Sequence, residues 1–499
     1  MFRRSLSLAA PLALLLASSF AAAQTAPAPD AAAGPRPIPT TLAPPAAPPG
    51  AAGPDAPVSK VTESLEAKLA SMQKGGGLTA EQAAQRAVVN SVDVASKKAS
   101  IAVADAELDA TKAQFIPELD LQARYTYLNK IHQGNIGFAG QTFSGDLLSP
   151  VFPNNYNLQA TLKVPLSDYV LRLSDAMAAS NHSQNAAKLD EQATKLSVAR
   201  DARVDYYQWI RAQGAGYVAA QALEAARGHA QDAKNAFDAG SVSRADLLRA
   251  LSQVKNAELT VAHYNSQIAV STEQLRVAMG DKAENNYDIG ENILVELPAY
   301  NTPPSLGAGY GEALEHRLEM KQLGESEASL RQQAKVAAAA NYPRLDASGD
   351  FIYANPNPRY FPPSQTWHDT WDANVVLSWT PTNMFGASAN THVAEAHADE
   401  VAAKRASLKN GLRLEVNQAM NALTEATVSL ASAREGLAAA EENYRVRREL
   451  YRAGKATVVD VTDAETDLTR SRLEVVNAHV DSRIARVQLE HALGRDVKR

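Results

Sequence analysis

The chain of 499 residues contains no cysteine. This excludes disulfides, zinc–thiolate sites, a cysteine nucleophile and a lipid anchor on an N-terminal cysteine. Beyond the first residues the chain also lacks any run of ~18 apolar residues, so no transmembrane helix is expected. The formal net charge of −6 argues against nucleic acid as a partner, and it is otherwise typical of ordinary solubility.

The N-terminus has the features of an export signal. Two arginines precede an apolar stretch that ends at Phe20, and three alanines follow. The pattern predicts a signal peptide over residues 1–23, whose removal takes away two positive charges and no acid. Residues 24–77 are rich in Ala, Pro and Gly and predict a tether without a core, with Gly75–Gly77 as linker.

Proline is scarce over most of the remaining chain. Twelve of the 25 prolines lie before residue 58, and the others cluster in short zones. The long stretches between them are rich in helix-forming residues, and proline is excluded from helix interiors. These proline-free stretches are 58–116, 166–297, 305–342 and 382–499. The chain is therefore predicted to form long helices interrupted by two short windows.

Each window shows two segments in which apolar and polar residues alternate. The segments run over residues 119–127 and 157–164 in the first window, and over 345–353 and 371–380 in the second. Alternation over about nine to ten residues, with aromatic residues near the ends, is typical of membrane β-barrel strands. A half-buried strand of a soluble sheet shows the same alternation. Strand length, aromatic placement and the export signal favour the membrane interpretation.

The chain is an internal duplication. Residues 113–129 align without gaps to 339–355, and residues 239–280 align to 453–494. The alignments divide the chain into two repeats, 78–297 and 298–499, each with the order helix, strand, strand, long helix, shorter helix.

The second alignment carries matching heptads. Large residues recur every seven positions, and mostly small residues follow three positions later, which predicts closely packed coiled-coil helices. A single stripe of this kind fits an ordinary amphipathic helix, but two copies in register favour the coiled coil. The first series is Leu247, Val254, Val261, Ile268 and Leu275 in the first copy, and Val461, Leu468, Val475, Ser482 and Leu489 in the second, with Ser482 as the one small residue.

The helix lengths predict that the helices together form the wall of a cylinder of uniform height. The long helices, about 168–238 and 384–452, would each reach ~105 Å. The shorter helices are close to half that length, so two stacked end to end would match one long helix. They are expected at about 79–115, 242–280, 310–341 and 456–493.

The four predicted strands are too few to close a membrane barrel, for which about eight is the minimum. Open strand edges cannot face lipid, because their backbone groups would remain unpaired. Several copies must therefore share one barrel. Two copies would give a barrel plugged by side chains, so this argument leaves three or four.

Several motifs carry a resemblance to a known family. Phe-Ile-Pro-Glu-Leu (115–119) and Asn-Tyr-Pro-Arg-Leu (341–345) mark the passages from helix to strand. Residues 451–463 and 237–248 form the two predicted hairpin tips. With the duplicated element order, these motifs make residues 78–495 similar to the TolC-like outer-membrane efflux protein family.

The resemblance implies a fold that is mainly α with membrane β. Three copies would form a homotrimer, with a shared 12-stranded β-barrel in the outer membrane and a long coiled-coil α-barrel in the periplasm of a Gram-negative cell. The partners implied are outer membrane lipids, a periplasmic adaptor protein, and an inner-membrane pump or ABC exporter. The function implied is a passive exit duct of a tripartite efflux pump or type I secretion system. Drugs, metals, metabolites and a secreted protein all stay open as substrates.

The predicted hairpin tips would form the periplasmic mouth, where the adaptor docks. Gly240 and Gly454 fit the helix cap that needs a positive φ. Asp460 and Asp463 follow the second tip on one helix face and, by resemblance, match the pore-constriction acids. Their simpler role is to stabilise a helix N-terminus, but in a trimer each would form a ring of three carboxylates that favours cations.

The resemblance also places Tyr451 and Asp246 in the hydrogen-bond network of the gate. This chain departs from the pattern at Ala456, where an arginine is expected. Lys455 or Arg244 would then supply the cation, and Arg244 is the better candidate.

Signals for an enzyme are weak. His392, Glu395 and His397 lie on a predicted helix without the spacing of a zinc protease, and surface polar residues explain them better than a metal site. Gly307, Gly309 and Gly311 follow no strand and lack the nucleotide-binding pattern. We expect no enzymatic activity, no cofactor and no metal. The alternative from another class is an exported coiled-coil structural protein or adhesin without a pore.

Overall fold

The computed structural model describes residues 71, 73–129, 134, 136–138, 140–143, 151–282, 285–295, 297–298, 300–361 and 363–498. All of them belong to one compact unit, Thr62–Arg499. The predicted signal peptide and most of the predicted tether lie outside the described residues.

The first repeat has the predicted order of elements. Its helices are α2 (Ala80–Asn90), α3 (Val92–Ala113), α5 (Leu166–Asp168), α6 (Ser174–Asp238) and α7 (Arg244–Met279), and a π-helical turn, η1 (Tyr169–Leu173), joins α5 to α6. Its main strands are β2 (Glu118–Tyr127) and β5 (Asn154–Val164), with a small hairpin of β3 (Ile136–Phe138) and β4 (Gln141–Phe143) between them.

The second repeat has the same order. It comprises α8 (Leu306–His316), α9 (Leu318–Ala338), the short η2 (Ala339–Asn341), β6 (Arg344–Asn355), β7 (His368–Ser378), α10 (Asn383–Arg452), α11 (Val458–Ala492) and η3 (Arg495–Lys498). The predicted duplication is therefore confirmed at the level of elements.

One feature common to both repeats was not predicted. The first helix of each is broken by a single residue with extended backbone, Ser91 (ψ 127°) and Arg317 (ψ 124°). The break falls at matching places, since Ser91 and Arg317 keep the offset that relates 113–129 to 339–355. The side chain of Ser91 caps the next helix by accepting a hydrogen bond from the Val94 N–H.

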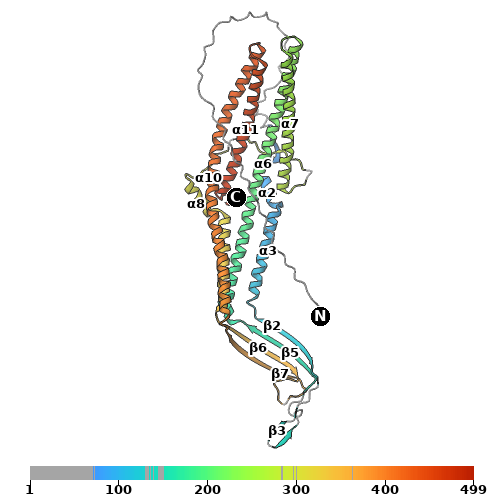
Figure 1. Ribbon diagram of the computed structural model, residues 1–499, viewed down its shortest axis with the longest axis vertical. Helices are drawn as coiled ribbons and strands as arrows, with labels where there is room; N and C mark the ends of the chain where they lie inside the picture. Colours follow the sequence, from blue (N-terminus) through green and yellow to red (C-terminus); the bar gives the residue numbers. More distant parts are fainter. Residues whose placement is uncertain are drawn as a thin grey trace, which may run out of the picture. The chain divides into compact units, whose positions relative to one another are not determined.

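The four main strands form one antiparallel sheet in the order β2-β5-β6-β7 (Figure 1). Strands from both repeats thus pair along β5 and β6, and β2 and β7 are the edges. The register places Leu121, Ala160, Phe351 and Trp371 in one row across the sheet. The next row, Gln122, Gln159, Ile352 and Thr370, lies on the opposite face.

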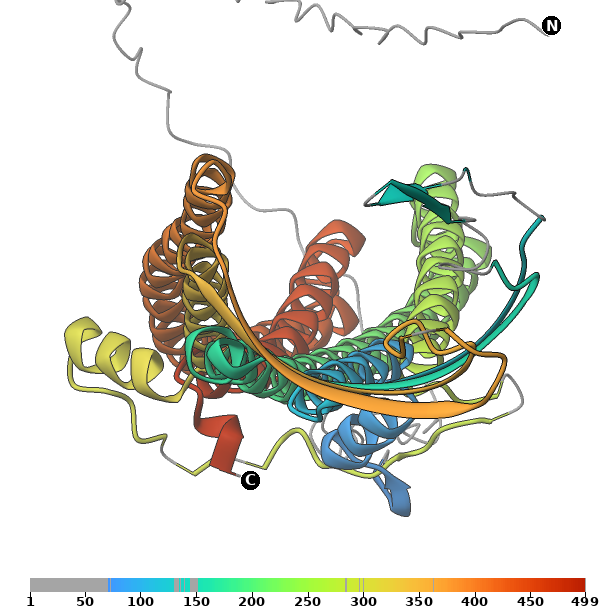
Figure 2. The ribbon, with the colours of Figure 1, turned by 90° about the horizontal axis from the view of Figure 1, so that it is seen from below.

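The shorter helices line up against the long ones as predicted. Helices α3 and α2 pack on the half of α6 nearer the sheet, and α7 packs on the other half (Figure 1). Helices α9, α8 and α11 cover α10 in the same way. Contacts of α6 with α9 and α11 join the repeats, and strands and helices curve as arcs that open to the same side (Figure 2). Among the described residues, no helix combines the length and apolar composition needed to cross a bilayer.

The largest buried side chains lie midway along α6. Tyr206 and Trp209 are almost fully buried. The Tyr206 hydroxyl donates to the Leu78 carbonyl at 2.6 Å, and Trp209 Nε1 donates to Thr272 Oγ1 at 3.1 Å. Elsewhere the helix contacts are made mostly by buried alanines, which allow close approach of the backbones.

The predicted linker glycines include one with a structural role. Strand β1 (Gln73–Leu78) lies beside the segment after α7, where the Leu78 N–H donates to the Asp288 carbonyl at 2.8 Å. A Cβ built on Gly77 would lie 2.6 Å from the Ile289 backbone, so only glycine fits there. The end of the predicted tether is thus ordered against the helical part.

Candidate functional site

The two hairpin tips, at the end of the helices far from the sheet, have the same backbone geometry. Gly240 and Gly454 adopt φ values of +74° and +69°, as predicted for these caps. In each tip the residue after the glycine donates back to the helix: Ser241 N–H to Ala236 O and Lys455 N–H to Leu450 O, both at 2.8 Å. These bonds satisfy carbonyls at the helix end, so each chain reversal is locally encoded.

A capping box follows each glycine. Asp246 Oδ2 accepts from the Ser243 N–H at 3.2 Å and from Ser243 Oγ at 2.7 Å. Asp460 Oδ2 accepts from the Thr457 N–H at 2.8 Å and from Thr457 Oγ1 at 2.7 Å. The Ser243 and Thr457 hydrogen bonds hold the pKa of the two carboxyls below the ordinary value of 3.8. Asp246 and Asp460 are therefore negatively charged at neutral pH.

The other predicted gate residues are not bonded to one another within this chain. The side chains of Asp463 and Arg244 are exposed and, within the part of the chain that the structure describes, take part in no hydrogen bond or ion pair. Tyr451 is half-buried. Burial raises the pKa of its hydroxyl, and the nearby charges of Asp232 and Asp246 raise it further. Tyr451 and Asp246 thus lie close across the two hairpins without a hydrogen bond between them.

The cation that pairs with Asp460 beside the second tip is one that the sequence analysis missed. Arg447 Nη1 lies 3.4 Å from Asp460 Oδ1, and both side chains are partly exposed. An exposed pair of this kind contributes little to stability, because solvent screens it. Its signal in the sequence is only that Arg447 precedes Tyr451 by one helical turn, which places both on one face of α10.

A polar cluster joins the two hairpins further from the tips. His229 Nε2 of α6 lies 3.2 Å from Glu465 Oε2 of α11 and 3.2 Å from the Tyr444 hydroxyl of α10. Arg472 Nη1 of α11 donates to Gln221 Oε1 of α6 at 3.1 Å. No periodicity links these residues, so only the packing of α6 against α11 reveals the cluster.

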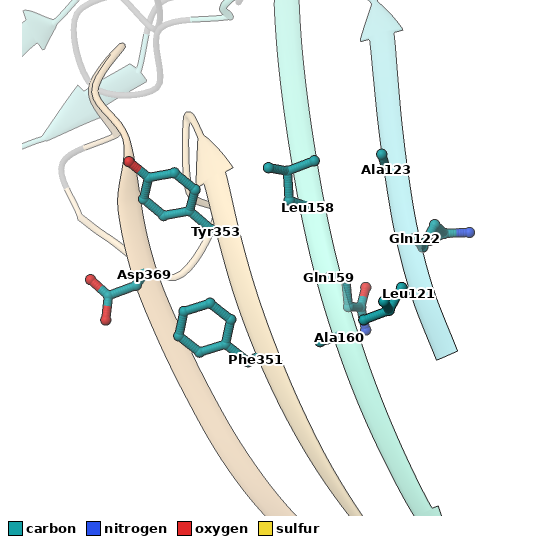
Figure 3. Close-up of a pocket in the computed structure, with 9 residues that line it drawn as sticks. All are labelled: Leu121, Gln122, Ala123, Leu158, Gln159, Ala160, Phe351, Tyr353 and Asp369. Carbon is teal, nitrogen blue, oxygen red and sulfur yellow. The ribbon is translucent and has the colours of Figure 1, made fainter. Parts of the chain in front are cut away.

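The sheet separates apolar from polar residues by face. One face carries exposed apolar side chains, among them Leu121 (73% exposed), Trp371 (75%) and Val375 (70%). Figure 3 shows a shallow hollow at this sheet, lined by Leu121, Gln122, Ala123, Leu158, Gln159, Ala160, Phe351, Tyr353 and Asp369. The other face carries mostly charged and amide side chains, such as Asp120, Gln159 and Asp350.

The residues considered for enzyme chemistry lie apart from both regions. His392, Glu395 and His397 are exposed on α10, and His397 Nδ1 lies 3.7 Å from Glu400 of the same helix. Among the described residues, no three His, Asp or Glu side chains gather as a metal ligand set. Gly307, Gly309 and Gly311 lie within α8, where Gly309 packs on Val416.

Comparison with known proteins agrees with this architecture. The family model for outer membrane efflux proteins matches residues 83–281 and 309–495, one segment in each repeat and more than half of the chain. A sequence search of curated proteins finds no match.

Solved structures share the fold. The outer-membrane channel OprN is 19% identical, with a TM-score of 0.68 over 89% of this chain and 98% of its own. The CmeC outer membrane channel of Campylobacter jejuni is 16% identical, with a TM-score of 0.71 over 88% of this chain and 94% of its own. The MtrE outer membrane channel of Neisseria gonorrhoeae, in its open state, is 16% identical, with a TM-score of 0.66 over 83% and 88%.

Proposed function

The chain belongs to the outer membrane efflux protein family, and we propose that three copies of it form the exit duct of a tripartite efflux pump or type I secretion system. The duct conducts passively and has no catalytic role. A periplasmic adaptor docks at the hairpin tips around Gly240 and Gly454, and an inner-membrane pump or ABC exporter supplies the substrate.

The observation that carries this proposal is the two-faced sheet. Its apolar face leaves large side chains such as Leu121 and Trp371 exposed, which a water-soluble surface avoids over so wide a patch. Its edge strands β2 and β7 need partners before they can enter lipid. A coiled-coil spacer or adhesin accounts for the helices, but it explains neither the exposed apolar face nor the unpaired edge strands.

Three copies would give every edge strand of the sheet a pairing partner. Each copy contributes four strands, so three give the 12 strands of a barrel wide enough for a duct. The β7 edge of one copy would pair with the β2 edge of the next. The apolar face then meets lipid and the polar face lines the lumen.

Aromatic side chains at both ends of the sheet support a position in the outer membrane. At the loop end, the Tyr353 ring stacks on Trp367 at 4.9 Å. At the helix end, Phe115 contacts Tyr169 at 5.9 Å, and Trp379 lies at the end of β7. The strands between them have 10 to 12 residues, close to the ~9–11 that cross a bilayer at a tilt. Aromatic residues of this kind sit at the two membrane interfaces.

At the tips, Asp460 and Asp463 would form rings of three carboxylates that attract cations into the mouth. The charge of Asp246 raises the pKa of Tyr451 across the two hairpins, and both residues would help to hold the mouth narrow. Arg244, which has no partner among the described residues, is available to a neighbouring copy. Arg447 already pairs with Asp460 inside one copy and takes over part of the role of the arginine that Ala456 replaces.

Planar-bilayer recording of the purified mature protein tests the duct, and light scattering in detergent tests the trimer. We expect ion-conducting channels from a species of three copies. A monomeric, water-soluble protein without conductance would refute the proposal.

The gate is tested by removing charge without removing the cap. Asp460→Asn keeps an oxygen that can accept the Thr457 hydrogen bonds, so its effect reports the charge. We expect Asp460→Asn and Asp463→Asn to reduce the preference for cations. Asp467→Asn, on the same helix but paired with Arg470, is the control. Equal effects of all three variants would argue against a constriction at the tip.

A further inference from the structure

The loop that follows β6 folds back onto β7. Asn357 is 1% exposed, and its Nδ2 donates to the His368 carbonyl at 3.0 Å and to Thr370 Oγ1 at 3.3 Å. Its Oδ1 accepts from the Arg359 N–H at 3.0 Å. The Tyr360 ring stacks on the His368 ring at 4.2 Å. A buried asparagine with three hydrogen bonds gives this turn a defined position.

The turn lies over the polar face of the sheet. Thr370 and Asp372 both belong to that face, and Arg359 Nη2 forms an ion pair with Asp372 Oδ2. This carboxylate oxygen is buried and takes no hydrogen bond from the described residues. The Asp372 side chain as a whole is 27% exposed, and its Oδ1 accepts a hydrogen bond from Asn374 Nδ2. Arg359 therefore provides the counter-charge for the covered oxygen, Oδ2.

A second carboxylate lies directly beside the first. Asp350 of β6 is the register partner of Asp372, so two like charges face each other across adjacent strands. Such a pair is destabilising on its own. Asp350 accepts from Thr161 Oγ1 at 2.6 Å and from Gln159 Nε2 at 3.1 Å, and Arg359 also acts on its charge. The positive charge of Arg359 thus acts on both Asp372 and Asp350.

We propose that Arg359 is a specificity-determining residue of the channel: it latches the β6–β7 loop across the polar face, and it neutralises part of the acidic charge at the loop end of the lumen. The proposal rests on the proposed function, since it needs the polar face to line a duct. In a trimer, three such latches would lie around the outer end of the duct, opposite the acidic tips.

The ion pair should affect both the conductance of the channel and its preference for cations or anions, and variants of the two partners should change that preference in opposite directions. Breaking the ion pair from either side removes the contact of the Arg359 side chain with β7 and widens the outer end, while the Asn357 hydrogen bonds keep the turn itself in place. The charge left behind differs: without Arg359 two carboxylates remain, whereas without the Asp372 charge a guanidinium gains influence. The loss of Arg359 should therefore favour the passage of cations, and the loss of the Asp372 charge should favour anions. The reason is that the field of an unpaired charge acts on ions that pass within a Debye length.

The experiment is planar-bilayer recording of the full mature protein under a KCl gradient. We expect Arg359→Ala and Asp372→Asn both to raise single-channel conductance. Arg359→Ala shifts the reversal potential towards greater preference for K⁺, and Asp372→Asn shifts it towards Cl⁻. The double variant Arg359→Asp with Asp372→Arg re-forms the pair and returns conductance towards the original level.

Arg344→Ala is the matched control. Arg344 lies on β6, on the same face as Asp350, and it pairs with Asp346 at 3.0 Å, but it does not hold the loop. It should shift the reversal potential and leave conductance unchanged. The latch is refuted if neither single variant changes conductance, or if Arg344→Ala reproduces both effects of Arg359→Ala. Absence of channels in the unmodified protein would instead refute the duct itself.

Discussion

Val270 of α7 is 58% exposed, whereas Ile484, at the matching position of the duplicated helix α11, is 8% exposed. The same contrast recurs along both helices. Val277 is 71% exposed and its counterpart His491 only 3%. The seam positions of the heptads face the long helix in both copies, but there too α11 is the more buried helix: Val475 is fully buried, whereas Val261 is half-buried.

The cause is position rather than sequence pattern. Helix α11 packs between α10 and α6, so both of its sides are covered within one copy. Helix α7 packs on α6, with α2 at its end, and Thr462 Oγ1 of α11 donates to its Gln253 Oε1 at 3.4 Å, but its outer side carries exposed side chains. Leu248, Leu259, Val270 and Val277 form an apolar stripe along that side. Under the proposed trimer, a neighbouring copy covers this stripe.

The covered helix has also acquired a polar role that α7 lacks. Arg483 of α11 donates to the carbonyls of Asn292 and Val295 at 3.0 and 3.1 Å. These bonds hold the connection between the two repeats against α11. The matching position in α7 is Ala269, which has no such segment to hold.

The largest effect is expected from charges on the outer faces. The double variant Leu259→Asp with Val270→Asp should keep the fold of the protomer but prevent trimer formation, because it puts carboxylates into the proposed contact between copies. Light scattering and bilayer conductance measure the loss, and circular dichroism checks the fold. The matched variant Leu473→Asp with Ile484→Asp should instead unfold the protomer. A stable, conducting trimer of the α7 variant would contradict the proposal that the outer face of α7 lies in the contact between copies.

A smaller effect is expected inside the seam. Val475→Ala removes two methyl groups from a fully buried site, and we expect it to lower the free energy of unfolding by about 2 kcal/mol. Val261→Ala, at the matching half-buried site, should cost less than half as much. Denaturant unfolding in detergent, followed by circular dichroism, measures both. Equal losses would mean that α7 is as well covered as α11.

The smallest effect is expected at the tips, where the two hairpins should behave alike. Ser243→Ala and Thr457→Ala each remove a cap, which typically costs ~1 kcal/mol of local stability. Because the pKa values of Asp246 and Asp460 are lowered on folding, their contribution is present above pH 3.8 and lost as the pH falls below it. Amide hydrogen exchange at the Asp246 and Asp460 N–H groups between pH 7 and pH 3 measures this loss. Protection that persists in one tip alone would show that another contact holds it.

Much of the fold was predictable because it follows from local rules. Proline exclusion located the long helices, alternation located the strands, and the two alignments identified the repeats. The capping glycines at positions 240 and 454 followed from turn chemistry. The breaks at Ser91 and Arg317 did not, because neither residue is a helix breaker and the extended backbone there is held by packing against the ends of α7 and α11: Asn90 Nδ2 donates to the Met279 carbonyl, and Arg317 Nη1 to the His491 carbonyl.

The candidate site was predictable only in part. The position of Asp246 and Asp460 just after the hairpin tips was predicted, but their capping boxes were not, and Arg447, His229 and Arg359 carry no periodic signal. Their partners are brought together by contacts across a hairpin, between repeats and from a loop onto a sheet.

By itself, the sequence determined the kinds of elements, their order, their lengths and the register of their apolar stripes, since each depends on residues that are neighbours along the chain. Only the tertiary structure decided which of two equivalent helices lies inside the protomer and which at its edge. It also decided which charges meet, because a charge pair depends on the distance between elements that the chain places far apart.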